Sequence, residues 1–271
     1  MRTVITANRS GLRLNLPELL RYRDLLWLLA YRDYRVRYAQ TFLGFAWAFV
    51  QPLLTMIVFI LVFNKAAGVD TGDIPYPVFV MTGLWAWSYL SFVLTQGGQS
   101  LILSSHLITK VYFPRLLIPL AKSLVAFIDF SVTFVFLVVL MLVYQYAPSP
   151  NVITLPLWLL ALIALSVSAG IWLSALTIRF RDIQHAIPFL VQIGLYFSPV
   201  AYHSSRVPEQ YHTLFYLNPL AAIIDGFRWA VLGTPLPEFP YLAYSLAVIV
   251  LLLVSGLYYF KRTERIMADI L

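Results

Sequence analysis

Residues 116–144 read LLIPLAKSLVAFIDFSVTFVFLVVLMLVY and contain only two charged side chains, Lys122 and Asp129. A helix that crosses a bilayer needs about 20 mainly apolar residues. The whole chain shares this character, because 61% of its 271 residues are apolar and only 11% are charged, whereas about 25% of the residues of a soluble domain are charged. The sequence therefore predicts an all-α membrane protein.

Six stretches of the chain have the length and apolar character of membrane spans. They cover approximately residues 41–63, 76–98, 116–144, 154–177, 185–202 and 240–260. The fifth is short and is bracketed by Pro188 and Pro199, so we expect its ends to be broken. Residues 1–271 are interpreted as a single transmembrane domain.

Basic residues are distributed unevenly over the connections between these spans. Sixteen of the 19 Lys and Arg residues fall on one side of the predicted membrane, and only Lys65, Arg206 and Arg228 fall on the other. Because Lys and Arg are enriched in cytoplasmic connections, both chain ends are predicted to be cytoplasmic. The net charge of +7 is explained by this topology, and no nucleic-acid surface is predicted, since the basic residues are dispersed along short loops.

Two cytoplasmic segments differ from ordinary connections. Residues 15–38 combine apolar residues at helical period with several arginines, which predicts an amphipathic helix in the plane of the membrane interface. Its role as a membrane anchor or as a docking surface for a partner stays open. Residues 100–115 predict a short amphipathic helix ended by Pro114. Its apolar residues are covered either by another protein or by the chain's own helices.

The connection between the fifth and sixth predicted spans, residues 203–237, contains two apolar stretches that are too short to span. They are Tyr211–Leu217 and Leu220–Leu232, separated by Asn218 and Pro219. The pattern predicts short re-entrant or interfacial helices on the outer side, which are tolerated at membrane depth only where protein or a water-lined cavity satisfies the backbone. An exit site and a simple cap on the bundle are both compatible with them.

The motifs of several enzyme classes are absent from the sequence. No GxxxxGK[ST], GxSxG or HExxH pattern occurs, there is no cysteine, and the four histidines are scattered. We therefore predict no catalytic residue, no metal site and no cofactor in this chain, and any ATP-driven step requires a separate ATPase.

A few polar and aromatic residues within the predicted spans are candidates for a translocation pathway. Asp129 lies mid-span, a position that commonly marks a pathway, and Lys122 is about 10 Å away along the helix, too far to pair with it. A serine or threonine of a neighbouring helix is the expected partner of Asp129, and structural and functional interpretations of this residue both stay open. Aromatic rings stack on sugars, although packing against lipid explains each ring equally well. The aromatic candidates are Trp85, Trp87, Tyr89, Phe92, Tyr196 and Phe197.

The order of these features resembles the membrane subunits of type 2 ABC exporters, over nearly the whole chain. The arginine-rich N-terminal helix is followed by six spans and a cytoplasmic Pro114-Arg115 turn. Further matches are Arg179-Phe-Arg-Asp-Ile183, Leu217-Asn-Pro-Leu220 and Phe227-Arg228. The likeness is closest to the polysaccharide and polyol-phosphate group, which exports O-antigen, capsule and teichoic acid chains.

This resemblance implies a channel-forming permease that works as a homodimer with two copies of a cytoplasmic ATPase, which binds ATP and Mg²⁺. The implied cargo is a polysaccharide on undecaprenyl diphosphate, most simply O-antigen, moved from the cytoplasm to the periplasm across the bacterial inner membrane. The residues that inherit contact with the ATPase are Arg21, Arg23, Arg32, Arg35, Arg37, Ser105, His106, Lys110, Pro114, Arg115, Arg179, Arg181 and Asp182. Asn218 and Arg228 join Asp129 and the aromatic residues as pathway candidates.

Three other functions are weighed against this one. An exporter of the same class could carry teichoic acid, capsule, a drug or a lipid. An intramembrane enzyme acting on polyprenyl phosphates would need a cluster of acidic, histidine or basic residues at one membrane face, and none is found on the outer side. An ion-coupled carrier would depend on Asp129, the only good candidate for a buried carboxylate in the predicted spans.

Overall fold

The computed structural model describes residues 16–39, 42 and 44–267, and within these ranges the regular structure is entirely helical. Five helical stretches of this part are long and apolar enough to cross a membrane. They are Gly44–Ala66, Tyr76–Leu103, Leu117–Val143, Pro150–Arg179 and Phe239–Glu264. Each one overlaps a span predicted from the sequence, and the prediction of an all-α membrane protein is confirmed.

The long stretches are built from several helical pieces. The first joins α3 (Trp47–Phe59) to a π-helical segment, Ile60–Ala66, and the second joins α4 (Tyr76–Phe92) to α5 (Gly98–Leu103). The others contain α7 (Leu117–Val143), α8 (Leu155–Arg179) and α12 (Phe239–Glu264). The short helices are α1 (Leu16–Arg21), α2 (Arg23–Tyr38), α6 (Ser105–Lys110), α9 (Ile183–Phe197), α10 (His212–Phe215) and α11 (Pro219–Leu232).

The predicted fifth span corresponds to α9, which has 15 residues, fewer than the roughly 20 needed for a full crossing. The count of six spans is therefore not confirmed. The expectation that Pro188 breaks this segment is wrong, because Pro188 lies inside the helix. Proline cannot donate to the carbonyl four residues earlier. That carbonyl, of Gln184, instead accepts a hydrogen bond of 3.1 Å from the Gln99 side chain.

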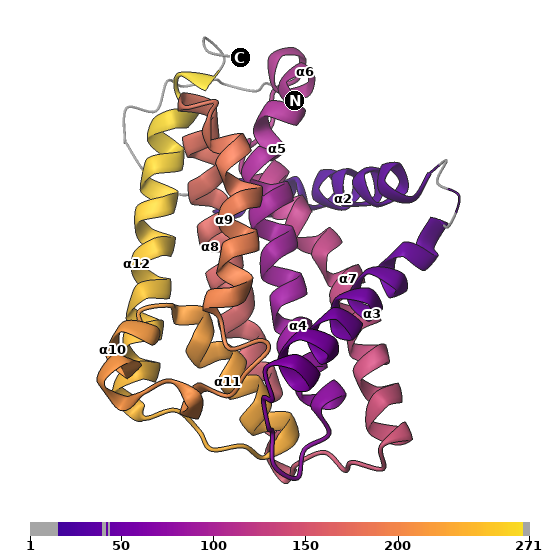
Figure 1. Ribbon diagram of the computed structural model, residues 1–271. Coiled ribbons are helices and arrows are strands. Elements are labelled where there is room, and N and C mark those ends of the chain that lie inside the picture. Colours follow the sequence, from indigo (N-terminus) through magenta and orange to yellow (C-terminus); the bar gives the residue numbers. More distant parts are fainter. Residues whose placement is uncertain (1–15, 40–41, 43, 268–271) are drawn as a thin grey trace.

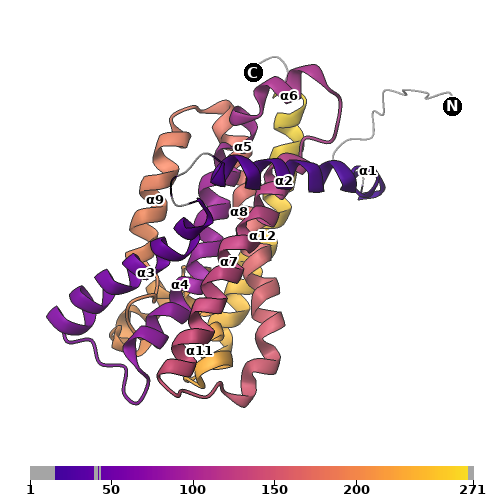
Figure 2. The ribbon, with the colours of Figure 1, turned by 90° about the vertical axis from the view of Figure 1, so that its right-hand side faces the viewer.

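The predicted N-terminal helix is present as α1 and α2, which are separated by Tyr22. Asn15, the first residue of the predicted range, lies outside the described residues. Figures 1 and 2 show α2 lying across the long axes of the bundle rather than along them. Its buried residues Leu29 and Ala30 pack in a cluster with Ala121 and Val125 of α7. One side of α2 is therefore bound to the bundle, while Trp27 and Tyr31 are exposed.

The core is centred on α4, which contacts α3, α7, α8 and α11. Thirteen of its 17 residues are buried, so most of its surface is covered by the neighbouring helices. By contrast, only 17% of an apolar 18-residue segment of the stretch Gly44–Ala66 is buried, and the stretch runs obliquely to the other long helices (Figures 1 and 2). Ile187 is the buried residue of α9. Both α3 and α9 therefore present apolar surface that the single chain does not cover.

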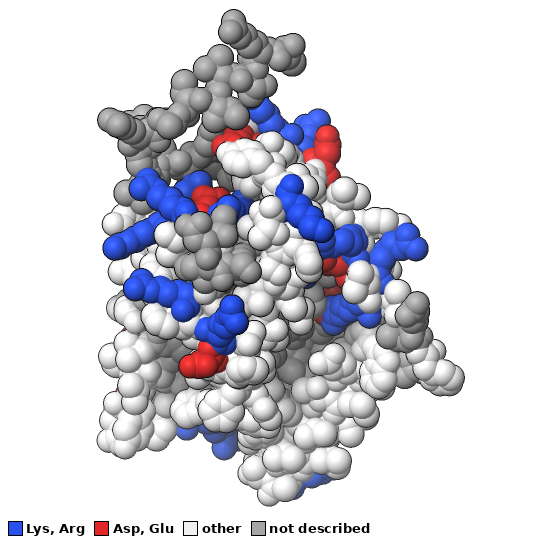
Figure 3. Space-filling view, turned by 90° about the horizontal axis from the view of Figure 1, so that it is seen from above, with Lys and Arg blue, Asp and Glu red and all other residues white. Residues whose placement is uncertain are grey.

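The two ends of the bundle differ in charge. We call the end formed by α1, α2, α6 and the last turns of α8 and α12 the basic end. Figure 3 looks onto it and shows Lys and Arg side chains spread across the surface, with fewer acidic ones among them. We call the opposite end, formed by residues 198–218 and α11, the far end; α10 and α11 lie there (Figure 1). α10 lies within the predicted stretch Tyr211–Leu217, and α11 begins one residue before the predicted stretch Leu220–Leu232 and ends with it.

Candidate functional site

A pocket of about 820 Å³ lies between α2, α3, α4, α7 and α9. Polar side chains are costly inside an apolar bundle unless they are paired, hydrogen-bonded or in contact with water. The pocket nevertheless gathers many of them. Its charged lining residues are Arg32, Asp33, Arg37, Lys122 and Asp129, and its amide and hydroxyl lining residues are Gln51, Thr55, Ser88, Ser91, Thr95, Gln96, Ser104 and Thr133.

Asp129 of α7 is bound by two side chains of α2. Its Oδ2 atom lies 2.7 Å from Nη1 of Arg37, and its Oδ1 atom accepts a 3.0 Å hydrogen bond from the Tyr38 hydroxyl. The Arg37 guanidinium also lies 4.7 Å from the centroid of the Phe92 ring. The expectation of a serine or threonine partner for Asp129 was wrong, since the partners come from the helix that crosses α7. Burial and the nearby Asp129 raise the pKa of Tyr38 above its ordinary value, so this hydroxyl remains a donor.

A second ion pair joins the same two helices. Nζ of Lys122 lies 2.7 Å from Oδ2 of Asp33, and the other oxygen of Asp33 accepts from Nε and Nη2 of Arg32 at 3.1 and 2.8 Å. Lys122 does not pair with Asp129, as expected from their separation. The pocket wall therefore carries two ion pairs between α2 and α7, with one acidic residue contributed by each helix.

The structure brings together residues that the sequence assigned to two different roles. Arg32 and Arg37, predicted to couple to an ATPase, line the same pocket as the pathway candidates Trp87, Phe92 and Asp129. Their functional roles stay predictions. The other pathway candidates lie outside this pocket. Trp85 and Tyr89 are buried in the core, Tyr196 and Phe197 are exposed on α9, Asn218 caps α11, and Arg228 is buried at the far end.

The remaining coupling candidates lie at or near the basic end. The predicted helix in residues 100–115 is present as the end of α5 and α6, and α6 stops at Lys110, before Pro114. Arg115 is held by the end of α12, because its backbone N–H donates to Oε1 of Glu264 at 3.3 Å and its guanidinium donates to the Glu264 carbonyl. The other coupling candidates lie in α1 and α2 (Arg21, Arg23 and Arg35), in α6 (Ser105 and His106), at the end of α8 (Arg179) and between α8 and α9 (Arg181 and Asp182).

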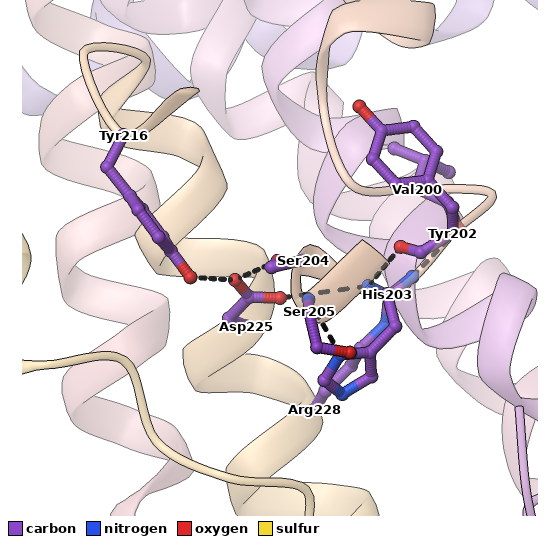
Figure 4. Close-up of polar contacts among 8 residues, drawn as sticks. All are labelled: Val200, Tyr202, His203, Ser204, Ser205, Tyr216, Asp225 and Arg228. Atoms are coloured by element: carbon purple, nitrogen blue, oxygen red, sulfur yellow. Dashed lines mark hydrogen bonds and ion pairs between the residues drawn. The ribbon is translucent and has the colours of Figure 1, made fainter. Parts of the chain in front are cut away.

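A second charged cluster lies at the far end, where Figure 4 shows the side chains of Ser204, Tyr216, Asp225 and Arg228. Asp225 is 5% exposed, and its Oδ2 atom accepts hydrogen bonds from the Ser204 hydroxyl and, at 3.0 Å, from the Tyr216 hydroxyl. Its Oδ1 atom lies 3.8 Å from Nη1 of Arg228, one turn later on α11. Burial raises the pKa of Asp225, and the positive charge of Arg228 opposes that rise.

Arg228 fixes the irregular segment that follows α9. Its two terminal nitrogens donate to the carbonyls of Val200 at 2.8 Å and Tyr202 at 3.3 Å. The carbonyl between them, of Ala201, accepts from the Tyr76 hydroxyl at 2.9 Å. Three successive carbonyls outside any helix are thus satisfied by buried side chains, as buried backbone requires. The guanidinium also lies 3.6 Å from the Phe79 ring centroid.

Glycine at position 83 of α4 permits this arrangement. A Cβ atom there would lie 3.0 Å from Nη2 of Arg228 and 3.0 Å from the Val200 backbone. Burial lowers the pKa of Arg228 to about 10, which still leaves the guanidinium charged at neutral pH. We call Ser204, Tyr216, Asp225 and Arg228 the far-end cluster.

Sequence reasoning did not select several residues of these two clusters, namely Asp33, Tyr38, Lys122, Ser204, Tyr216 and Asp225. A signal was present for some of them. Asp33 and Arg37 are four residues apart, and Asp225 and Arg228 are three apart, so each pair shares one helix face. On α2 an acidic residue, Asp33, precedes a basic one, Arg37. On α7 the basic Lys122 precedes the acidic Asp129, so the two helices carry complementary charges. Among the described residues, no group of three or more His, Asp or Glu side chains is arranged to hold a metal ion.

Comparison with known proteins gives consistent matches along the chain. Residues 24–232 match the profile of a family described as ABC-2 type transporter. The O-antigen export system permease protein RfbA of Klebsiella pneumoniae is 29% identical over 249 residues, which cover 92% of this chain and 95% of the relative. The RfbA protein of Myxococcus xanthus is 28% identical over 251 residues, covering 91% and 95%. The polysialic acid transport protein KpsM of Escherichia coli is 22% identical over 237 residues, covering 87% and 92%.

Proposed function

Since the chain belongs to the ABC-2 type transporter family of membrane proteins, we propose that it is the permease subunit of an exporter that carries O-antigen or a related polysaccharide. The observation that carries this proposal is the match to two O-antigen permeases over more than nine tenths of this chain. The same proposal includes a homodimer of this chain and two copies of a separate ATPase, which binds ATP and Mg²⁺.

The polar pocket supports a hydrophilic cargo. A glycan carries many hydroxyl groups, and each one that lacks a hydrogen bond in hydrocarbon costs several kcal/mol. The pocket offers hydroxyl and amide groups beside the aromatic faces of Trp87 and Phe92. A single chain supplies only one wall of a passage wide enough for a polymer. The uncovered apolar surfaces of α3 and α9 are where a second copy would pack.

The charge difference between the two ends supports an orientation. We place the basic end in the cytoplasm, because Lys and Arg are enriched on the cytoplasmic side of membrane proteins, and transport then runs toward the far end and the periplasm of an inner membrane. The ATPase would dock at the basic end, on α6 and the ends of α8 and α12. Leu103, Val111 and Tyr112 of this region are exposed by 67%, 55% and 83%, which suits contact with a partner.

A lipid diphosphate is the part of the cargo that we propose this chain binds. Arginine binds phosphate oxygens through paired, charge-assisted hydrogen bonds, and α2 carries Arg23, Arg32, Arg35 and Arg37. Undecaprenyl diphosphate would place its isoprenoid chain in lipid and its phosphates near α2. Teichoic acid, capsule, drug or lipid cargo is the alternative within the same class.

Deletion of the gene in its host tests this proposal. We expect the long polysaccharide to disappear from the cell surface and lipid-linked polymer to accumulate inside, with both effects reversed by the gene on a plasmid. Affinity purification of the tagged chain in mild detergent should recover an ATPase in equal amount. Unchanged surface polysaccharide in the deletion strain would reject the cargo, and recovery of the chain without any ATPase would reject the role as a permease subunit.

A further inference from the structure

The two ion pairs between α2 and α7 have reversed order of charge along the two helices. On α2 the acidic residue Asp33 precedes the basic residue Arg37, whereas on α7 the basic residue Lys122 precedes the acidic residue Asp129. Each charge therefore meets its opposite where the helices cross, at 2.7 Å in both pairs. A shift of α2 along α7 by one turn would separate both pairs at once.

Both carboxylates use both of their oxygen atoms. Asp129 is bound by Arg37 and Tyr38, and Asp33 is bound by Lys122 and Arg32. Three contacts therefore join the two helices, namely Arg37–Asp129, Tyr38–Asp129 and Lys122–Asp33, whereas Arg32 and Asp33 both belong to α2. Together with the apolar cluster around Leu29 and Ala30, these contacts hold α2 on α7.

These pairs are not sealed inside the core. The side chains of Asp33 and Lys122 are each 12% exposed, that of Asp129 is 16% exposed and that of Arg37 is 31% exposed. All four line the pocket, so a ligand in the pocket can reach them. Basic residues are also in excess there, because Arg32, Arg37 and Lys122 face two carboxylates. The pocket thus favours a negatively charged ligand.

We propose that Asp33, Arg37, Lys122 and Asp129 form a latch that holds α2 on α7 and that a phosphate-bearing anion in the pocket releases. A phosphate or diphosphate offers Lys122 and Arg37 oxygen acceptors equivalent to those of Asp33 and Asp129. Once Arg37 and Lys122 bind the anion, both ion pairs between α2 and α7 are broken. Asp129 then keeps only the Tyr38 hydroxyl, and Asp33 keeps only Arg32 of its own helix. The latch rests on the proposed function, since the lipid diphosphate of the cargo is the anion that would reach this pocket.

The absence of native cysteine allows a direct measurement of the latch. Ala30→Cys places a single thiol on the face of α2 that packs near α7, at a residue that is only 7% exposed. Its rate of reaction with a maleimide reports how often α2 leaves α7. Ala126→Cys, at a fully buried position of α7, is the matched control and should remain protected in every condition. The full chain in lipid nanodiscs is used throughout.

Two anions and one neutral compound separate the sources of the phosphate group. Inorganic pyrophosphate tests the free anion, farnesyl diphosphate tests an anion carried by an isoprenoid, and farnesol tests the isoprenoid alone. We expect farnesyl diphosphate, and pyrophosphate at higher concentration, to increase the reaction rate of Ala30→Cys several-fold. Farnesol, and sodium chloride at equal ionic strength, should leave it unchanged. No increase with either phosphate compound would overturn the proposal.

Variants test whether the ion pairs are the latch. The double change Asp33→Asn with Asp129→Asn should make the thiol react several-fold faster without any anion and should abolish the response to farnesyl diphosphate. Asp24→Asn, which removes an exposed carboxylate from the same helix, should change nothing. The exchange Asp33→Lys with Lys122→Asp should restore protection relative to Asp33→Lys alone. An unchanged rate in the Asn double variant would overturn the latch. If these tests overturn the latch while deletion of the gene still removes the surface polysaccharide, the export function is retained and only the latch is rejected.

Discussion

The pocket and the far-end cluster contain the same three chemical groups in different surroundings. In each, a carboxylate accepts a tyrosine hydroxyl at 3.0 Å and faces an arginine: Tyr38, Asp129 and Arg37 in the pocket, and Tyr216, Asp225 and Arg228 at the far end. The arginine side chain is 31% exposed in the pocket and 1% exposed at the far end. The pocket trio has room to exchange partners, whereas the far-end trio is enclosed.

The enclosed trio is held by more than its ion pair. The two oppositely charged atoms of Asp225 and Arg228 are 3.8 Å apart, and the Nε atom of Arg228 has no hydrogen-bond partner. Removing charges from water is costly, and attraction between the two ions repays the cost only when other hydrogen bonds complete the site. At the far end those bonds come from backbone carbonyls and from Ser204 and Tyr216. The geometry of the far-end cluster is therefore fixed, whereas the side chains in the pocket have room to change partners.

Removal of each arginine is the strongest test of this difference. Arg228→Met leaves Asp225 buried without its counter-ion and the carbonyls of Val200 and Tyr202 without donors, so we expect a loss of about 3–5 kcal/mol of unfolding free energy. Arg37→Met should cost roughly 1 kcal/mol, because Asp129 remains accessible from the pocket. Both losses are measured by thermal unfolding in detergent, with size-exclusion chromatography as the readout of the folded fraction.

The matched control for Arg228 is Arg206→Met, which removes an exposed arginine from the same end of the molecule. This change should stay within about 0.5 kcal/mol. Equal losses for Arg37→Met and Arg228→Met would show that exposure does not distinguish the two trios, and the comparison would fail.

The two tyrosine hydroxyls give a finer test at equal hydrogen-bond length. Tyr216→Phe removes a donor from a buried carboxylate, and we expect a cost of about 2 kcal/mol. Tyr38→Phe should cost less than about 1 kcal/mol, since water in the pocket can replace the hydroxyl. The same unfolding assay applies, and a larger loss for Tyr38→Phe than for Tyr216→Phe would contradict the difference in enclosure.

Acidification gives the smallest expected effect, and it is confined to the far end. Burial lowers the pKa of His203 below 6.5, and its Nδ1 atom accepts from the Ser205 N–H at 3.2 Å. The unfolded chain protonates this side chain near pH 6.5, whereas the folded chain resists protonation. The stabilising contribution of neutral His203 is therefore complete above about pH 6.5 and is lost as the pH falls below it.

Unfolding temperatures measured between pH 8 and pH 5.5 check this sign. The decrease on acidification should be smaller in His203→Gln than in the unmodified chain. His106→Gln, at an exposed position of α6, serves as the control and should retain the original slope. A steeper decrease in His203→Gln would mean that the protonated ring is the stabilising form.

Much of the fold could be predicted because membrane thickness sets the length of each apolar run. The predicted span 116–144 differs from α7 by one residue at each end. The break expected at Pro188 was wrong because its effect depends on Gln99, a residue of another helix that supplies the missing hydrogen bond. A local pattern cannot reveal such a partner.

Neither the orientation of α4 nor the partners of Asp129 could be predicted from the sequence, because both depend on how the helices pack against one another. Because α4 carries large apolar residues on all sides, its periodicity could not separate Trp85 and Tyr89, which face the core, from Trp87, which reaches the pocket. Asp129 was recognised as a charged residue within a span, but Tyr38 is 91 residues away in the chain. Its contact depends on how α2 crosses α7, which composition does not encode.

The attachment of residues 200–202 to both α4 and Arg228 has a consequence for how the chain is made. Val200 and Tyr202 are synthesised fewer than 30 residues before Arg228, and at about 5–20 residues per second the interval is roughly 1–6 s. During that time the carbonyls of Val200 and Tyr202 emerge without the guanidinium that later binds them. A ribosome that stalls in this interval leaves a nascent chain in which these two carbonyls lack their buried donor.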